Sequence, residues 1–356
     1  MRMPETPSVD FPWSQVLTTL LAEEDLQPTL AQASLEEVMS GRASQVQIAA
    51  FLTALRAKGE SAAEIAAFTD TMLAHAVPVH VAGPAVDTCG TGGDSSGTVN
   101  ISTIAAIVVA ACGVTVVKHG NRAASSKCGS ADLLEALGIR LELTSAEVEH
   151  CVAEAGIGFC FAPSFHPAMR FAGPVRRQLG IPTVFNVLGP LSNPARPSAQ
   201  LVGVANPRLA PVVAGALHLR GTRALVVRGD DGLDELTTHT TSRIWSTLGE
   251  SVEEFVVAPA DLGITVPEPD ALLGGDATTN AAIAEAVFRG DAQAEAVSDA
   301  VCLNAGAALA ALEGAAANPI EDITAGMVRA KAAIASGYAA DVLQRWRVAS
   351  HPGIAG

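Results

Sequence analysis

The sequence of 356 residues is short of positive charge and of aromatic side chains. It carries 22 lysines and arginines against 37 aspartates and glutamates, a formal net charge of −15, and only 4% of its residues are aromatic. Nucleic-acid-binding proteins usually present a basic face, and single-strand binders add aromatic rings on which bases stack. The composition therefore argues against a nucleic-acid partner. Hydrophobic residues make up 49% of the chain, which indicates a folded protein long enough for two domains.

A signal peptide and a membrane-spanning segment are not evident either. The first residues, MRMPETPSVDFPW, contain no apolar core of the kind that signal peptides require. The longest uncharged stretch, 98–117, approaches the length of a spanning helix, but it contains several polar side chains and is divided by Gly113. We therefore expect a buried helix followed by a buried strand, and a cytoplasmic protein with no membrane partner.

The six cysteines show no CxxC spacing and lie mostly in apolar surroundings. They are Cys89, Cys112, Cys128, Cys151, Cys160 and Cys302. In a long chain without a signal peptide, free buried thiols are the usual outcome, and we expect them here.

The N-terminal segment, from about residue 10 to 76, is predicted to contain helices only. Residues 34–37 and 61–64 both match the capping box, and the pattern recurs at 144–147. Apolar residues between 48 and 55 recur at helical spacing. We interpret residues 1–82 as a helical domain. Its wide apolar face is equally compatible with packing on its own chain and with a dimer surface.

From residue 85 onward, short apolar runs alternate with helical stretches. Strands are expected at 85–88, 114–118, 199–205 and 222–229, and helices at about 101–112, 130–138 and 207–220. This alternation predicts an α/β domain over 83–356 with a mostly parallel sheet. The proline- and arginine-rich region 163–197 is predicted to form short helices, of which those from about 173–195 join the helical domain. Residues 280–346 are predicted to be Ala-rich helix.

A glycine-rich loop, DTCGTGGD at 87–94, is expected directly after the first strand. Glycine lets the backbone approach a ligand closely, and free N–H groups at a helix start bind anions. Ser95 stands where a dinucleotide fingerprint needs its third glycine, and no Gly-Lys-Ser/Thr completes a Walker A loop. The glycine spacing is equally compatible with a tight turn. Asn100, Ser102 and Thr103 at the start of the next helix favour an anion site.

Positive charge is concentrated after the second strand, in KHGNRAASSKCGSAD at 118–132. Ligands bind at the carboxyl ends of strands in open α/β sheets. A phosphate-binding loop would explain three cations and a histidine here, in a chain otherwise short of cations. The alternative is a solvated loop that ends in a helix cap at Ser130 or Asp132. His119 taken alone is more typical of a structural histidine.

Four carboxylates lie within 230–235, after the last expected strand. Mg²⁺ prefers hard oxygen ligands, often one or two carboxylates together with substrate phosphates. For Asp231 we favour a simple turn, because Asp-Gly is a strong turn signal. For Asp234 and Glu235 we favour a magnesium site, since a divalent ion would relieve their mutual repulsion.

A final cluster combines HPAMR at 166–170 with the vicinal pair Arg176 and Arg177. Arginine is suited to bidentate recognition of a carboxylate. We interpret Arg177 as surface charge. No Ser/His/Asp arrangement, zinc spacing or acid/base pair is recognisable. The residues thus indicate a Mg²⁺-dependent enzyme with a pyrophosphate-bearing substrate and a small acidic co-substrate.

The motifs together resemble the anthranilate phosphoribosyltransferase family. The matching segments are GTGGD at 90–94, NIST at 100–103, KHGNRAASSKCGSAD at 118–132, HPAMR at 166–170, PVRRQLG at 174–180, FNVLGPLSNPA at 185–195 and DGLDEL at 231–236. Their order and spacing match over nearly the whole chain. Cys128 departs from the serine that the family usually carries, and Cys89 stands at a variable position. Neither removes a group that the chemistry needs.

The resemblance implies transfer of the 5-phosphoribosyl group from phosphoribosyl pyrophosphate to the amine of anthranilate, in tryptophan biosynthesis. The implied fold is a small all-helical domain with a larger α/β domain, as in nucleoside phosphorylases, usually a homodimer through the helical domain. Two Mg²⁺ ions per monomer would be held by Ser102, Asp234 and Glu235. No general base is assigned.

The resemblance also implies two sets of binding residues. The phosphoribosyl pyrophosphate set is Gly90, Gly93, Asp94, Thr98, Asn100, Ile101, Ser102, Thr103, Lys118, His119, Gly120, Asn121, Arg122, Ala123, Ala124, Ser125, Ser126 and Ser130. The anthranilate set is Gly90, Asn121, Arg176, His119 and Pro190, with Arg176 facing the carboxylate.

Two alternatives stay open. A nucleoside phosphorylase would share the fold but take free phosphate, and the segments PVRR and FNVLGPLSNPA argue against it. A non-enzymatic nucleic-acid-binding relative would need a basic groove, which the acidic composition disfavours.

Overall fold

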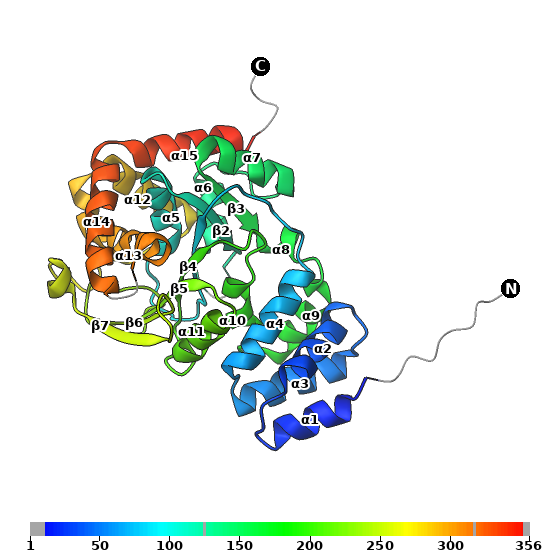
Figure 1. Ribbon diagram of the computed structural model, residues 1–356. Coiled ribbons are helices and arrows are strands. Elements are labelled where there is room, and N and C mark those ends of the chain that lie inside the picture. Colours follow the sequence, from blue (N-terminus) through cyan, green and yellow to red (C-terminus); the bar gives the residue numbers. More distant parts are fainter. Residues whose placement is uncertain (1–10, 124–125, 316–317, 352–356) are drawn as a thin grey trace.

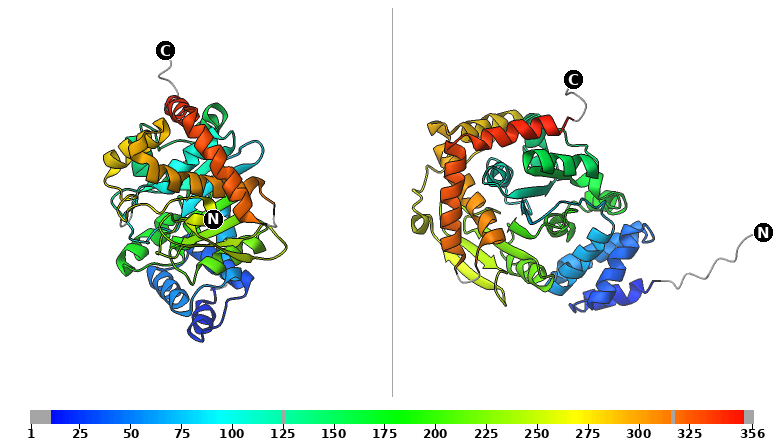
Figure 2. Two further views of the ribbon diagram at one scale, coloured as in Figure 1. Left: turned by 90° about the vertical axis from the view of Figure 1, so that its left-hand side faces the viewer. Right: turned by 45° about the horizontal axis from the view of Figure 1, so that its top comes forward.

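The computed structural model describes residues 11–123, 126–315 and 318–351. Over its described residues the N-terminal segment contains only helices, as predicted, and the structure shows these as α1 (Trp13–Leu21), α2 (Pro28–Met39), α3 (Gln45–Lys58) and α4 (Ala62–Ala74). They gather at one end of the molecule, drawn in blue in Figure 1 and in both views of Figure 2.

Two of the three predicted capping boxes are confirmed, and one is wrong. Ser61 caps α4 and Thr144 caps α7 (Ser145–Ala155), each through the reciprocal pair of bonds that the pattern predicts. Ser34 instead lies inside α2, where its buried hydroxyl donates to the Leu30 carbonyl. Proline at the first helical position starts this helix at Pro28, so Ser34 is an interior residue.

A seven-stranded sheet forms the centre of the second domain, in the order β3-β2-β1-β4-β5-β6-β7. The strands are β1 (Ala85–Gly90), β2 (Thr115–Gly120), β3 (Ile157–Phe161), β4 (Ala199–Gly203), β5 (Arg223–Gly229), β6 (Ser242–Ser246) and β7 (Glu253–Val257). The first five run parallel, and β6 and β7 are antiparallel additions at one edge. The mostly parallel α/β sheet is therefore confirmed, although the sequence analysis missed β3, β6 and β7.

Further helices complete the described part of the chain. They are α5 (Ile101–Ala111), α6 (Ser130–Ala136), α7, α8 (Ala162–Phe165), α9 (Met169–Leu179), α10 (Phe185–Leu191), α11 (Ala210–Leu219), α12 (Ala277–Arg289), α13 (Glu295–Glu313), α14 (Pro319–Ala335) and α15 (Tyr338–Ala349), with 3₁₀ turns η1 (Pro259–Leu262) and η2 (Ala292–Ala294). Alternate residues of β5 enter two cores. Leu225 and Val227 join the core around α5 and α13, and Ala224 and Val226 join the core shared with the helical domain.

Residues 292–313 form the one described helical stretch that is long and apolar enough to cross a membrane, judged by length and composition alone. Within it, 72% of the most apolar window is buried inside the protein. The stretch packs against α14 and α5, so it is accounted for as a core helix. The uncharged region 98–117 forms α5 and β2, a buried helix followed by a buried strand as predicted.

The region 163–197 forms short helices rather than sheet, as predicted. α9 packs against α2 and α3, and α10 contacts both α4 and β2. These two helices therefore connect the N-terminal helices with the end of β2. The carboxyl ends of parallel strands meet at one edge of a sheet, so the loops after β1, β2, β4 and β5 are brought together there.

Candidate active site

The loop after β5 folds back over the ends of β1 and β4. Gly90 and Gly203 are paired in register at these strand ends. A Cβ atom on Gly203 would overlap the backbone carbonyl of Asp234, and one on Gly90 would overlap the Asp234 carboxylate. Only glycine leaves room for this approach, so the two strand ends position Asp234 directly.

Ser102, Asp234 and Glu235, the three residues predicted to hold metal, lie together. The Gly92 N–H donates to Asp234 Oδ2 at 2.7 Å, and the Ser102 N–H donates to Glu235 Oε1 at 3.1 Å. Both carboxylates are only 8% exposed. Burial raises both pKa values above their ordinary range; the charge of Asp94 adds to this for Asp234, and that of Asp234 adds to it for Glu235.

These residues fit Mg²⁺. They offer two adjacent carboxylates and a hydroxyl, which are hard oxygen donors, and two buried like charges that a divalent ion would neutralise. Among the described residues, no cluster of three or more His, Cys, Asp or Glu side chains has metal-binding geometry. An ion here would therefore take its remaining ligands from water and substrate oxygens, as Mg²⁺ commonly does.

Lys118 is buried beneath this cluster rather than free in the loop. It is 2% exposed, and its Nζ donates to the Thr88 carbonyl and lies 3.4 Å from Ser102 Oγ. Its charge lowers the pKa of both Asp234 and Glu235, against the effect of burial. The ammonium therefore acts on the site as the buried counter-charge of the two carboxylates.

The glycine-rich loop adopts the backbone that its composition predicts, with φ of 65° at Gly92 and 83° at Gly93. Ser96 contacts Asp94 and lies 3.2 Å from Thr98 Oγ1. At the start of α5, Ile101 and Thr103 are buried, and the Ile101 N–H already donates to Val99.

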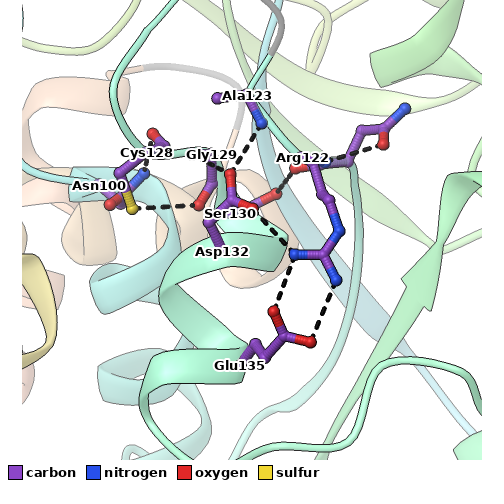
Figure 3. A network of polar contacts seen from close by, with 9 residues as sticks. Asn100, Arg122, Ala123, Cys128, Gly129, Ser130, Asp132 and Glu135 are labelled. Atoms are coloured by element: carbon purple, nitrogen blue, oxygen red, sulfur yellow. Dashed lines mark hydrogen bonds and ion pairs between the residues drawn. The ribbon is translucent and has the colours of Figure 1, made fainter. Parts of the chain in front are cut away.

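Asp132 links Ala123 and Gly129, on either side of residues 124–128 in the loop after β2, as Figure 3 shows. Its Oδ2 accepts from the N–H groups of Ala123 and Gly129, both at 2.9 Å. Arg122 pairs with Asp132 and, in bidentate fashion, with Glu135 at 2.9 and 3.1 Å. The positive charge of Arg122 in the loop is thus neutralised by carboxylates of α6.

The other predicted residues of this loop are placed as follows. Ser130 Oγ donates to the Asn121 carbonyl, Gly120 packs against Ser130, Asn121 is exposed and Ser126 Oγ contacts the Cys128 carbonyl. Ala124 and Ser125 lie outside the described residues. Asp132 stands at the third position of α6 and accepts from Gly129, the residue that precedes the helix. The helix cap considered from the sequence, at Ser130 or Asp132, is therefore wrong in position: Gly129 is the N-cap residue, and Ser130 and Asp132 lie inside α6.

His119 faces a second histidine that the sequence analysis left without a role. The rings of His119 and His166 lie 5.0 Å apart, and His119 Nδ1 lies 2.9 Å from the Gly189 carbonyl. Burial lowers the pKa of His119 to about 3 and that of His166 to about 4. Both rings are therefore neutral near pH 7. His119 Nε2 is buried and has no hydrogen-bond partner within the described part of the chain.

Arg176 and Arg177 differ as predicted. Arg177 is exposed, whereas the guanidinium of Arg176 lies 5.3 Å from the Phe185 ring centre and 3.4 Å from Asn186 Oδ1. Partial burial lowers the Arg176 pKa. No carboxylate of the described residues forms an ion pair with it. α10 supplies Phe185 and Asn186 to Arg176 and Gly189 to His119, with Pro190 buried beside it.

The carboxylate loop confirms one local expectation and adds one residue that was not predicted. Asp231 forms a turn, as expected, because its Oδ1 accepts from Leu233 and its Oδ2 accepts from Thr237. Sequence reasoning missed Asn304 in α13. Its carboxamide bonds both the N–H and the carbonyl of Leu236 at 3.0 Å, next to Glu235. A lone asparagine in an apolar helix was the only signal available.

Comparisons with known proteins agree with this architecture. Residues 82–340 match a family described as the glycosyl transferase family, a/b domain, and residues 14–76 match its helical bundle domain. An anthranilate phosphoribosyltransferase of Acidothermus cellulolyticus is 55% identical over 347 residues, covering 97% of this chain and 96% of the relative.

Two solved structures extend the likeness. The anthranilate phosphoribosyltransferase of Thermus thermophilus is 40% identical with a TM-score of 0.87, over 94% of this chain and 99% of that one. The Saccharomyces cerevisiae enzyme in complex with PRPP and Mg is 28% identical with a TM-score of 0.86, over 96% and 98%. Because both domain models match and relatives span nearly its full length, the chain belongs to the anthranilate phosphoribosyltransferase family.

Proposed function

We propose that this protein transfers the 5-phosphoribosyl group from phosphoribosyl pyrophosphate to the amine of anthranilate, releasing pyrophosphate, as the second step of tryptophan biosynthesis from chorismate. The observation that carries the proposal is the meeting of Asp234, Glu235 and Ser102 with the glycine-rich loop at the ends of β1 and β4. A yeast family member holds PRPP and Mg. The activity is that of a pentosyltransferase.

The donor would lie across the loops after β1 and β2. Cleavage of the C1–O bond leaves positive charge on the ribose and negative charge on pyrophosphate. Mg²⁺, two ions per monomer, would stabilise the departing anion when bound. The N–H groups of the glycine-rich loop and the buried charge of Lys118 add to that stabilisation without reorganising.

The acceptor would lie between Arg176 and His119. The guanidinium of Arg176, which forms no ion pair within the described residues, suits the anthranilate carboxylate, and the rings of His119 and His166 together with Pro190 would provide a neutral wall. An aromatic amine is a weak nucleophile, so holding it in line with C1 supplies much of the rate. No side chain is assigned as a general base.

The direct test is the loss of anthranilate fluorescence when phosphoribosyl pyrophosphate and Mg²⁺ are added to the protein. We expect a loss that depends on all three components. Fluorescence that stays constant, together with phosphorolysis of a nucleoside by inorganic phosphate, would overturn the proposal in favour of a nucleoside phosphorylase. A gel shift at physiological salt tests the nucleic-acid-binding alternative, for which we expect no shift.

We further infer a homodimer through the helical domain, and a cytoplasmic location. Leu21 in α1 and Val46 in α3, both in the helical domain, are 75% and 78% exposed, and the proposed contact would cover these apolar side chains. All six cysteines are free, in keeping with a reducing compartment. Light scattering during size-exclusion chromatography tests the dimer, and Leu21→Glu/Val46→Glu should convert it to a monomer.

A further inference from the structure

We propose that Asn280, in α12, is a positioning residue that holds the loops after β1 and β2 at a set distance from each other and thereby sets the affinity for phosphoribosyl pyrophosphate. The inference rests on the proposed function, because it assigns that substrate to these loops. Asn280 belongs to none of the motifs recognised in the sequence. Its side chain is 1% exposed, so it acts through its neighbours.

Two carboxamides form a chain between the loops. Asn280 Nδ2 donates to Asn100 Oδ1 at 2.9 Å, and Asn100 Nδ2 donates to the Cys128 carbonyl at 3.0 Å. Asn100 directly precedes α5, and its side chain makes no hydrogen bond to the helix N-terminus. The Asn100 side chain therefore links the loop after β1 to the loop after β2. Its hydrogen bond with Asn280 fixes the orientation of the Asn100 amide.

The carboxamide oxygen of Asn280 is also engaged in a hydrogen bond. It accepts from the Gly275 N–H at 2.7 Å. A Cβ atom on Gly274 would lie 2.7 Å from this oxygen and 2.9 Å from the Val99 nitrogen, so the segment before α12 is packed tightly against both. With one donor and one acceptor engaged, the carboxamide has a single satisfactory orientation.

The backbone that precedes α12 pairs with residues 97–99, which lie between the glycine-rich loop and α5. The Gly274 N–H donates to the Gly97 carbonyl at 2.9 Å, and the Val99 N–H donates to the Leu272 carbonyl at 3.0 Å. Thr98 and Leu273 form an isolated antiparallel bridge. A segment about 180 residues away in the chain thus forms an outer support for Thr98 and Asn100, two residues of the proposed donor site.

The chemistry requires asparagine at this position. Aspartate would place a carboxylate oxygen against Asn100 Oδ1, and the two acceptors would repel each other. Leucine would leave both Asn100 Oδ1 and the Gly275 N–H, which are partly buried, without these partners, and each such loss lowers stability. In either variant Asn100 would turn, and its bond to the Cys128 carbonyl would be lost.

The test compares Asn280→Asp and Asn280→Leu with the unchanged protein. We expect the Kd for phosphoribosyl pyrophosphate with Mg²⁺, measured by calorimetry, and its KM to rise about tenfold or more. The KM for anthranilate should stay within about twofold. Without ligand, hydrogen exchange should become faster in 94–103 and 126–132.

The matched control is Ala284→Gly, one turn along α12 at a fully buried position. It should lower the melting temperature without changing the Kd. An unchanged Kd in the Asn280 variants, or an equal rise in both KM values, would overturn the proposal. If the unchanged protein binds phosphoribosyl pyrophosphate but leaves anthranilate unconsumed, the proposed function fails while the Kd comparison still tests Asn280. If the unchanged protein does not bind phosphoribosyl pyrophosphate, both the proposed function and the proposed role of Asn280 are overturned.

Discussion

The backbone carbonyl of Asp234 packs directly on the α-carbon of Gly203, so closely that a β-carbon on Gly203 would occupy the same space. Gly203 ends β4 and Asp234 belongs to the loop after β5. Gly203, which belongs to none of the recognised motifs, thus fixes the position of Asp234, a proposed metal ligand.

Gly203→Ala should therefore displace the Asp234 loop. We expect a loss of stability of about 1–3 kcal/mol from overpacking and a larger loss of Mg²⁺-dependent activity. Urea unfolding and the fluorescence assay measure the two effects. Gly173→Ala in α9 is the control, because a Cβ atom there meets only Arg177 at an ordinary 3.6 Å. A Gly203→Ala protein with full activity would contradict the proposed role of the close contact.

Removing both carboxylates should separate metal binding from stability. Asp234→Asn/Glu235→Gln takes away two buried like charges but also the counter-charges of buried Lys118, so without Mg²⁺ the two effects oppose each other and we expect little change in the melting temperature. Activity should be abolished, and Mg²⁺ with phosphoribosyl pyrophosphate should no longer raise the melting temperature. Asp230→Asn, at a partly exposed ion pair with Arg243, controls for loss of a nearby charge. Full turnover by the double variant would place the metal site elsewhere.

Arg176→Ala should chiefly raise the KM for anthranilate. A hydrogen bond to a charged group contributes about 1.5–3 kcal/mol, which corresponds to roughly a 10- to 150-fold rise. Initial rates at varied anthranilate and saturating phosphoribosyl pyrophosphate provide the measurement. Arg177→Ala, at the exposed neighbour, should leave the KM unchanged. Equal effects of the two substitutions would show that general positive charge, and not a specific contact, is responsible.

The pair His119 and His166 should make the fold sensitive to acid. Their folded pKa values of about 3 and 4 lie below the ordinary 6.5, so between about pH 6.5 and 4 the unfolded chain binds protons that the folded chain does not. The free energy of unfolding should therefore fall as the pH falls through this range.

The measurement is urea unfolding at pH 7, 6 and 5. His166→Gln should reduce the difference in unfolding free energy between pH 7 and 5, whereas His150→Gln, at an exposed position on α7, serves as the control. An identical pH dependence in the His166→Gln protein would rule out this histidine as a source of acid sensitivity.

Much of the local structure could be predicted because its causes lie within a few residues. The Ser61 and Thr144 caps, the Asp231 turn and the apolar runs of β1, β2, β4 and β5 depend on near neighbours. β3 was missed because it is short and contains Gly158, a residue type that is depleted in strands. β6 and β7 lie at the antiparallel edge, outside the strand–helix alternation on which the prediction rested.

The sequence by itself determined the fold class and the types of group in the site: glycines at strand ends, paired carboxylates, and arginine near proline-rich helices. Only the tertiary structure shows that Lys118 is buried near the two carboxylates. It also shows that the Asp234 carbonyl packs on Gly203 and that Asn280 donates a hydrogen bond to Asn100. The physical reason is range. Periodicity and caps report on neighbours up to about four residues away, whereas these contacts join separate parts of the chain through the packing of the sheet and its helices.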